Sequence, residues 1–409
     1  MQLAPHQIKI VENLADKAGL FLSMRVGKTP TAIRLACARA HNTLIVVPKS
    51  LKNQWLSEVD IWKNSETNFY IISKDDLRLN KNIPQKIDSI IVDEAHLAFA
   101  NYQSKTFKSL ESLIKKHDVK FIWLLTGTPQ TSNYWAAYSY GKLLGKNWNW
   151  FEWKKFFFYD IKFCRCKTAC KHRKIPKPRT DREPQLLEIY RKIGVFLSLK
   201  DISEVVDDVD IIEEFPLNEA QKQLIKEAWD PLPIVRYGAQ HQLESGVKKG
   251  DGYTEGLNFP IDKDKRLVEL VDSIDKVVIV CRYLDQIEKY KQLFANIIGK
   301  EIFTISGQIK EEAGDVAKKA EQSQAAIVLV QGDTAAGYSL KSFNTMIFAS
   351  MSYSFTNYEQ MKARIKAKDK NIACEYIHLL TEVDSIDMAV YMSVRKKQDF
   401  NIELYKNYV

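Results

Sequence analysis

The stretch that decides the fold is Ile90-Ile91-Val92-Asp93-Glu94-Ala95-His96, an apolar run that ends in two adjacent carboxylates. A short run of β-branched residues predicts a strand, and a strand buried on both faces of a parallel sheet is apolar throughout. Ligands of such sheets bind at the edge where the strands end. There one carboxylate can hold Mg²⁺ while the other orients and deprotonates a water that attacks a phosphoryl group. We therefore expect Asp93 to ligate Mg²⁺ and Glu94 to act on the water; the alternative is a plain exposed acidic turn.

Apolar runs of the same kind recur in both halves of the chain, each followed by a segment with helical spacing. This alternation is typical of a parallel sheet covered by helices. The predicted strands are Thr43 to Val47, Phe69 to Ile72, Ile87 to Val92, Lys120 to Leu125, Lys276 to Cys281, Glu301 to Ser306, Ala325 to Gln331, Thr345 to Ser350 and Glu375 to Leu380. The sequence thus predicts an α/β protein with a first lobe over residues 1–150 and a second over 263–409. Residues 151–262 are expected to form a basic, cysteine-bearing insertion with return helices and a linker.

Length and composition are typical of a soluble protein with two domains. The chain has 409 residues, of which 45% are hydrophobic and 27% charged, and this length exceeds one ordinary core. No run of about 18 apolar residues occurs, so we expect neither a signal peptide nor a membrane span. Six cysteines in such a chain do not form a disulfide framework. We expect a cytoplasmic protein.

A second chemical motif, Met24-Arg25-Val26-Gly27-Lys28-Thr29, precedes a helical pattern. Backbone N–H groups of Arg25, Val26 and Gly27 at the start of a helix would hold phosphates. Lys28 would neutralise the β- and γ-phosphates, and the Thr29 hydroxyl would ligate Mg²⁺. Leu22 stands where the general pattern has its first glycine. Together with the carboxylate pair, the loop predicts ATP and Mg²⁺ as ligands.

A third motif, Thr126-Gly127-Thr128-Pro129-Gln130, places small hydroxyl groups after another predicted strand; a simple turn of glycine and proline is the alternative. The ordered set of Gly27-Lys28-Thr29, Asp93-Glu94-Ala95-His96 and Thr126 to Pro129 resembles the motor of superfamily-two helicases. The finer match is to the Swi/Snf-like group of DNA translocases. The compact size and the form of the phosphate loop are similar to those of phage and other viral members. The resemblance implies two RecA-like parallel-sheet lobes.

The resemblance also implies roles for residues of the first lobe. Leu3-Ala4-Pro5-His6-Gln7 resembles the entry motif of the group, in which Gln7 contacts adenine. Val47-Pro48-Lys49-Ser50 with Trp55 resembles its first DNA-contacting motif, and Ile71-Ile72-Ser73 continues it. The residues implied to contact nucleic acid here are Lys49, Ser50, Ser73 and Thr126. Phe196 to Asp201 is similar to the group's leucine-arginine-arginine-threonine-lysine segment but lacks its arginines.

The second lobe resembles the group in three further motifs. Ile305-Ser306-Gly307-Gln308 is similar to its glycine turn, and Thr334 to Leu340 to its fifth motif, which couples DNA to nucleotide. The resemblance implies that Gly307 and Thr334 contact nucleic acid and that Gly337 lies at the nucleotide. Tyr358 to Ile365 resembles the sixth motif, in which Gln360 and Arg364 face the nucleotide and the arginine stabilises charge on the transferring phosphoryl group.

One position departs from the group. Ala367 stands where a second arginine is usual, flanked by Lys366 and Lys368. Lysine supplies charge but not the bidentate fork of arginine. The resemblance implies an ATP-dependent translocase or helicase, a DNA-dependent ATP hydrolase that remodels duplex, forked or branched DNA as a monomer, with replication or recombination proteins as further partners. A nucleic-acid-binding scaffold with weak or disabled ATPase, or an RNA helicase, stays open as an alternative.

The insertion carries the net charge of the chain. Between Lys154 and Arg182 there are eleven Lys or Arg residues against Asp160 and Asp181, and the whole chain has a net charge of +9. Such an excess attracts a polyanion such as a phosphate backbone, whereas a solvated basic loop is the alternative.

The insertion also carries two clusters of special residues. Cys164, Cys166, Cys170 and His172 would give Zn²⁺ three thiolates and one imidazole, but free cysteines in a basic loop fit equally well. Upstream, aromatic residues interleave with lysines and would either pack in the first lobe or stack on nucleic-acid bases; they are Trp148, Trp150, Phe151, Trp153 and Phe156.

Overall fold

The computed structural model divides into two compact units, which we call unit one (residues 1–203) and unit two (residues 204–409). The residues that the structure describes are 2–23, 25–127, 134–159, 178–198, 201–202, 207–228, 230–250, 256–295, 297–308, 312–333, 337–367, 370–382 and 384–396. None of the helices formed by these residues is long and apolar enough to cross a membrane.

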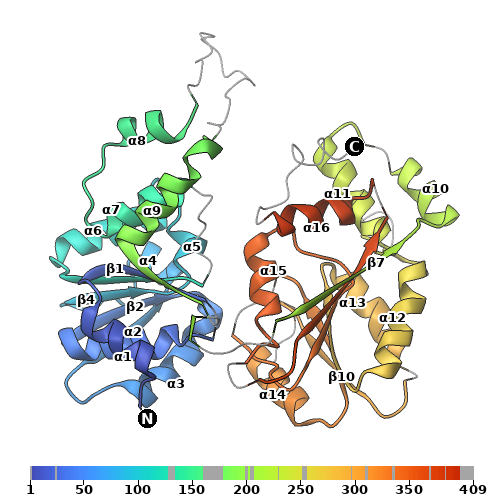
Figure 1. Ribbon diagram of the computed structural model, residues 1–409, viewed down its shortest axis with the longest axis horizontal. Coiled ribbons are helices and arrows are strands. Elements are labelled where there is room, and N and C mark those ends of the chain that lie inside the picture. The colour runs from blue at the N-terminus through green and yellow to red at the C-terminus, as the bar shows by residue number, and fades with distance from the viewer. Residues whose placement is uncertain are drawn as a thin grey trace. The chain divides into compact units, whose positions relative to one another are not determined.

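Unit one contains a six-stranded parallel sheet with the strand order β3-β2-β4-β5-β1-β6 (Figure 1). Its strands are β1 (Lys17–Leu22), β2 (Asn42–Val47), β3 (Asn68–Ser73), β4 (Ser89–Val92), β5 (Phe121–Leu125) and β6 (Gly194–Leu197). All residues of β4 are buried, and Ile91 lies in register with Ile45 of β2 and Trp123 of β5. The apolar run before Asp93 thus belongs to an inner strand, which explains its composition.

Helices cover both faces of this sheet. Their bounds, with two 3-10 turns, are α1 (Pro5–Asn13), α2 (Lys28–Arg39), η1 (Lys49–Leu51), α3 (Lys52–Trp62), α4 (Lys74–Arg78), α5 (Ala95–Ala98), α6 (Lys105–Lys116), α7 (Tyr134–Leu143), α8 (Trp150–Phe157), η2 (Thr180–Arg182) and α9 (Glu183–Ile193). In Figure 1, α1, α2 and α3 lie on one side of the sheet, and α6, α7 and α9 lie on the other.

Unit two contains a second six-stranded parallel sheet, with the strand order β11-β12-β10-β13-β14-β7. Its strands are β7 (Val209–Phe215), β10 (Lys276–Cys281), β11 (Glu301–Ile305), β12 (Ala326–Gln331), β13 (Thr345–Phe348) and β14 (Glu375–Thr381). Alternate residues of β10 enter different apolar clusters: Val278 and Val280 belong to one, and Val277 and Ile279 to another. Since successive strand residues point to opposite faces, the sheet is buried on both sides.

The helices of unit two are α10 (Glu219–Glu227), α11 (Pro233–Glu244), α12 (Asp262–Ser273), α13 (Leu284–Phe294), α14 (Ala313–Gln322), α15 (Phe355–Lys362) and α16 (Ile386–Arg395). A short antiparallel pair, β8 (Val247–Lys248) and β9 (Leu257–Asn258), lies between α11 and α12 in the sequence.

The predicted α/β fold of two parallel-sheet lobes is confirmed, and each predicted strand is present with small differences at its ends. Residues 151–262 were expected to form an insertion with return helices and a linker, and they also contribute one edge strand to each sheet. There β6 pairs with β1 and extends the first sheet, whereas β7 pairs with β14 and extends the second. Neither was predicted: β6 is apolar but has only four residues, and three acidic residues interrupt the apolar pattern of β7. The inner strand β1 was not predicted either.

Candidate active site

The phosphate loop connects β1 to α2 and turns at Gly27, which caps the helix in a left-handed conformation with φ of +90°. A Cβ atom at this position would lie 2.4 Å from Nε2 of Gln7. Both the backbone angle and the lack of space therefore require glycine. The free N–H groups at the start of α2 provide the partial positive charge that binds phosphate.

Helix α1 is attached to this loop through two side chains. Gln7 is buried, and its Nε2 donates to the Gly27 carbonyl at 3.1 Å and to Oγ1 of Thr31 at 3.3 Å. His6 Nε2 donates to the Val26 carbonyl at 3.0 Å. Gln7 was expected beside adenine, and it does lie directly against the nucleotide loop. Its contact with the base stays a prediction.

The basic and hydroxyl residues of the loop lie where the motif predicts. Lys28 is the first residue of α2, and its Nζ donates to the Leu22 carbonyl at 3.1 Å. Arg25 adopts a φ of +69°, a strained angle for a residue with a side chain. Thr29 follows in the first turn of α2 and is half-buried.

The carboxylate of Asp93 is buried at the end of β4 and is held by two donors. Trp55 Nε1 donates to its Oδ2 at 2.7 Å, and the Glu94 N–H donates to its Oδ1 at 2.9 Å. Burial and then the charge of Glu94 raise the pKa of Asp93 to about 6, although Trp55 and Lys28 both lower it. The sequence had grouped Trp55 with the DNA-contacting residues, but this side chain is only 2% exposed and serves the carboxylate instead.

Glu94 follows with a φ of +46° and begins the short helix α5. Its Oε2 is buried and lies 3.3 Å from Nδ1 of His96, while that same Nδ1 is hydrogen-bonded with Thr126 Oγ1 at 2.9 Å. Burial, followed by the charges of Lys28 and Lys74, lowers the pKa of His96 to about 4, so the ring is neutral near pH 7. Since the shorter contact takes the Nδ1 of His96, Oε2 of Glu94 has no hydrogen-bond partner among the described residues.

Lys74, the first residue of α4, is a further charged neighbour that the motifs did not indicate. Burial lowers the pKa of its ammonium group, and the charges of Asp75, Glu94 and Asp93 oppose that change. Only its position after a strand end, next to Ser73, was available in the sequence as a signal.

The residues around β4 fit Mg²⁺ and a nucleotide phosphate. Oε2 of Glu94 is buried without a hydrogen-bond partner among the described residues, and burial together with the negative charge of Glu94 raises the pKa of Asp93. A divalent cation would offset that negative charge, and carboxylate and hydroxyl oxygens are the ligands it prefers. Asp93 and Thr29 are the residues that would hold it.

The residues expected to contact nucleic acid in unit one divide into two groups. Lys49 and Ser50 are exposed in η1, directly after β2. Ser73, in contrast, is 6% exposed and caps α4 by accepting from the Asp76 N–H at 3.0 Å, and Thr126 is fully buried against His96. Burial rules out a direct DNA contact for Thr126 in this conformation and leaves Ser73 little surface for one.

In unit two, the glycine turns lie after strand ends. Gly307 is exposed after β11, and its N–H donates to Oε1 of Gln331 at 3.3 Å. Gly337 has a φ of +88°. Thr334 lies outside the described residues.

Arg364 and Gln360 are both buried in unit two. Nη1 of Arg364 donates to the Tyr338 carbonyl at 2.8 Å, and its guanidinium lies 5.1 Å from the centre of the Tyr338 ring. Two residues from different motifs, Arg364 and Tyr338, are thereby connected. Gln360 lies in α15, one turn before the arginine.

The lysine before Ala367 has its own partner. Nζ of Lys366 forms an ion pair with Oδ2 of Asp208, just before β7. Lys362 makes a similar pair with Asp210 of the same segment, at 2.8 Å. Lys366 therefore supports the edge strand in this conformation. Lys368 lies outside the described residues.

The expected zinc ligands Cys164, Cys166, Cys170 and His172 also lie outside the described residues, so zinc binding stays a prediction.

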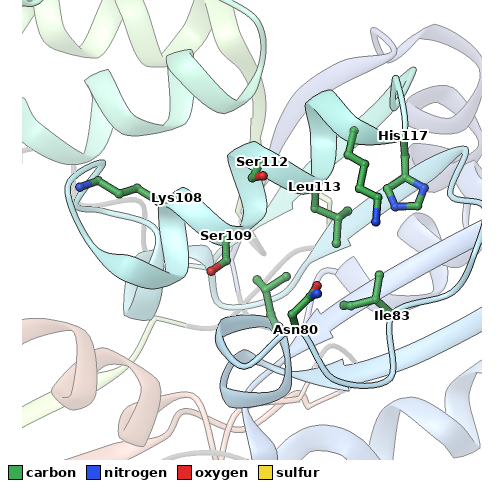
Figure 2. A pocket seen from close by; sticks show the side chains of 9 residues that line it. Asn80, Ile83, Lys108, Ser109, Ser112, Leu113 and His117 are labelled. Atoms are coloured by element: carbon green, nitrogen blue, oxygen red, sulfur yellow. The ribbon is translucent and has the colours of Figure 1, made fainter.

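A separate hollow of about 390 Å³ lies between α4 and α6 (Figure 2). Its lining includes Asn80, Lys108, Ser109, Ser112 and His117. None of the residues expected in the active site belongs to this lining. It also lacks the carboxylate pair that phosphoryl transfer needs, so it is not the catalytic site.

Two comparisons with known proteins bear on this arrangement. Residues 262–366 match the helicase conserved C-terminal domain, a region that includes Gly307, Gly337, Gln360 and Arg364. Over the whole chain, the SWI2/SNF2 ATPase core of Sulfolobus solfataricus in complex with dsDNA is similar, with 18% sequence identity and a TM-score of 0.44. That comparison covers 100% of this chain and 93% of the other.

Proposed function

We propose that this protein is a DNA-dependent ATPase that moves along duplex DNA and remodels duplex, forked or branched structures. The observation that carries the proposal is the grouping of Lys28, Asp93 and Glu94 at one sheet edge of unit one, in a chain whose unit two contains the helicase match. Either feature alone is compatible with many phosphate-binding proteins. Their combination with the DNA-contacting motif at Lys49 and Ser50 favours a nucleic-acid motor.

In this proposal, the N-terminus of α2 and Lys28 bind the β- and γ-phosphates. Thr29 and Asp93 would hold Mg²⁺, which would neutralise charge on the phosphoryl oxygens. Glu94 orients the attacking water and accepts its proton, a role that its unpartnered Oε2 suits. Neutral His96 lies beside Glu94 and is hydrogen-bonded to Thr126 of the third motif. By its resemblance to the sixth motif, Arg364 is the residue that would supply positive charge to the transferring group.

The first test is ATP turnover measured with single strands, blunt duplexes, forks and four-way junctions. We expect duplex-containing DNA to stimulate turnover, because the motifs are similar to those of duplex translocases. Lys28→Ala is the control and is expected to lower turnover by several orders of magnitude. Turnover that no nucleic acid stimulates would contradict the proposal, and strand separation of RNA duplexes in an unwinding assay would favour the RNA helicase instead.

The second candidate is a nucleic-acid-binding scaffold with a weak ATPase, which Ala367 and the ion pair of Lys366 with Asp208 favour. Ala367→Arg restores the missing guanidinium. If the protein is a motor limited by this position, the substitution should raise kcat by at least about tenfold, since an arginine at a transferring phosphoryl group contributes on the order of 10³ or more. Turnover equal to that of Lys28→Ala in both the original protein and the variant would support the scaffold.

A further inference from the structure

Helix α8 presents aromatic side chains to solvent as well as to the core. Trp153 and Phe157 are buried, and Trp153 stacks on Trp148 with ring centres 4.9 Å apart. Phe151, however, is 80% exposed, and Phe156 is 41% exposed. The packing of unit one therefore accounts for only part of the aromatic content of this helix.

Tyr159, two residues after the helix, is 56% exposed and belongs to the same region. We call Phe151, Phe156 and Tyr159 the aromatic surface. An isolated bridge between Phe158 and Pro178, with the Arg179 N–H donating to the Phe157 carbonyl at 2.9 Å, attaches the following segment to this region. In Figure 1, α8 lies farther from its sheet than α7 and α9 do.

Positive charge accompanies the aromatic surface. The guanidinium of Arg182 lies 4.5 Å from the ring centre of Phe156, and that of Arg179 lies 5.8 Å from the ring centre of Tyr159. Both arginines also pair with Asp181, at 3.1 and 3.4 Å, so their charge is partly neutralised. The larger excess is in the sequence: between Tyr159 and Pro178 the chain has seven Lys or Arg residues and a single acid, Asp160. Tyr159 of the aromatic surface directly precedes that basic segment. Pro178, at its other end, forms the bridge with Phe158.

A single exposed apolar side chain is ordinary and needs no function. Three exposed aromatic rings just before a strongly basic segment, two of them beside guanidinium groups, are a different case. Each nucleotide base has a flat face that stacks on an aromatic ring whatever its sequence, and basic residues bind the phosphates between the bases. Phe151 is 80% exposed, so most of its ring surface is open to solvent.

We propose that the aromatic surface binds unpaired bases of DNA by stacking. The inference rests on the proposed function for the choice of DNA as the partner, and it adds the feature that is recognised, a single-stranded end or the unpaired arm of a fork. Blunt duplex offers no free base faces along its length, so it binds through the phosphate contacts of the two units.

The experiment measures the affinity of the full chain for an oligothymidylate and for an abasic oligomer of the same length. Both carry the same phosphates, but only the first has bases. We expect the double variant Phe151→Ala/Phe156→Ala to bind the oligothymidylate about tenfold more weakly, the loss typical of removing base stacking on an aromatic ring. Binding of the abasic oligomer and of blunt duplex should not change.

Two controls make the result specific. Phe151→Tyr/Phe156→Tyr keeps the rings and should retain the affinity for oligothymidylate. Ile61→Ala removes a side chain that is 49% exposed on α3 of the same unit and should change neither affinity. If the alanine double variant binds oligothymidylate as well as the original protein does, or loses affinity for both oligomers equally, the aromatic surface is not a stacking site. A partner protein would then be the better explanation of its exposure.

The same proteins separate this inference from the proposed function. Stimulation of ATP turnover by blunt duplex tests the motor, and the alanine double variant should retain it. If blunt duplex stimulates ATP turnover but the protein binds oligothymidylate no more tightly than the abasic oligomer, the stacking site alone is overturned. If the protein binds oligothymidylate more tightly than the abasic oligomer through Phe151 and Phe156, but no DNA stimulates its ATP turnover, the motor alone is overturned.

Discussion

At the scale of single residues, Asp93 is a buried carboxylate whose pKa depends on a few neighbouring groups. Burial and its neighbour Glu94 raise its pKa to about 6, close to the pH at which a motor must work. Hydrogen bonds from Trp55 and from the Glu94 N–H, together with the charge of Lys28, limit that rise. A small loss among these donors should therefore move the titration of Asp93 into the physiological range.

Trp55→Phe tests this balance, because it removes the N–H donor and keeps most of the buried ring. A hydrogen bond to a charged group contributes about 1.5–3 kcal/mol, and one pKa unit corresponds to about 1.4 kcal/mol. We expect the pKa of Asp93 to rise by about one unit or more. Since the ionised carboxylate is the form that holds Mg²⁺, the acid limb of kcat/KM for ATP should move to higher pH by the same amount.

The control for this variant lies on the same helix. Nε1 of Trp62 donates to Oε2 of Glu58 at 3.1 Å, one turn away and outside the candidate site. Trp62→Phe should leave the pH profile unchanged. A profile that shifts equally in both variants, or in neither, would show that the Trp55 hydrogen bond does not set the charge of Asp93.

Gly27 is a second residue at which the local geometry decides the outcome. Gly27→Ala adds a Cβ atom both at a φ of +90° and within 2.4 Å of the Gln7 amide, so the loop or α1 must shift. Gly145→Ala is the matched control, since it has a φ of +81° but its nearest neighbour is Lys17 Cδ at 3.9 Å. Both variants should lose about 1–2 kcal/mol of unfolding free energy in urea titrations.

Only Gly27→Ala should also weaken the binding of a fluorescent ATP analogue, by at least about tenfold, because a misplaced loop loses several phosphate contacts at once. Unchanged analogue binding in Gly27→Ala would show that the loop does not hold the nucleotide.

At the scale of elements, three helices of unit two are joined by a buried ionic network. Asp387 of α16 is fully buried and is paired with Lys263 of α12 and with Nε2 of His241 of α11, the latter at 3.1 Å. Burial alone would raise the pKa of Asp387, but Lys263 and His241 hold it well below its usual value. Glu244 of α11 accepts from the Ile386 and Asp387 N–H groups at the start of α16. The network thereby attaches α11 and α12 to the helix that follows the last strand.

Asp387→Asn should lower the unfolding free energy of unit two by about 3–5 kcal/mol, because it leaves the buried ammonium of Lys263 without a counter-charge. Asp315→Asn is the control: its partner Lys318 lies 3.3 Å away on the surface of α14, and such exposed pairs contribute about 0–1 kcal/mol. Chemical denaturation followed by circular dichroism measures both. Equal effects of the two variants would mean that the buried network relaxes at little cost.

At the scale of the whole molecule, the boundary between units falls between Ser203 and Glu204. Each unit has its own six-stranded sheet and its own apolar clusters. We expect the fragments 1–203 and 204–409 to fold separately. The first fragment should bind ATP and not hydrolyse it, because Arg364 belongs to the other unit.

A shorter second fragment that begins at Pro216 tests the contribution of β7. It lacks the edge strand together with the ion pairs of Asp208 with Lys366 and of Asp210 with Lys362. We expect its Tm to fall by at least about 5 °C relative to fragment 204–409, since each kcal/mol shifts the Tm of a domain of this size by roughly 2–4 °C. Equal Tm values in thermal scans would show that β7 is dispensable and that the unit begins later in the chain.

The sequence by itself determined most of the strands and the residues proposed to carry the chemistry. An inner parallel strand must be apolar along its length, and phosphate binding requires glycine, lysine and a hydroxyl in a fixed local order, so both leave a signal in consecutive residues. That is why Gly27, Lys28, Asp93 and Glu94 were identified together with nine of the twelve strands in the two large sheets.

Only the tertiary structure decided which side chains are neighbours. Trp55 belongs to a segment that resembles a DNA-contacting motif, and the packing of α3 places its side chain against Asp93. Thr126 was expected at the nucleic acid, but it is buried against His96, 30 residues earlier in the chain. The edge strand β6 is only four residues long, and acidic residues interrupt the apolar pattern of β7. The aromatic residues of α8 divide into a buried and an exposed group. Burial and pairing of this kind depend on contacts between distant segments, and no local pattern of residues records them.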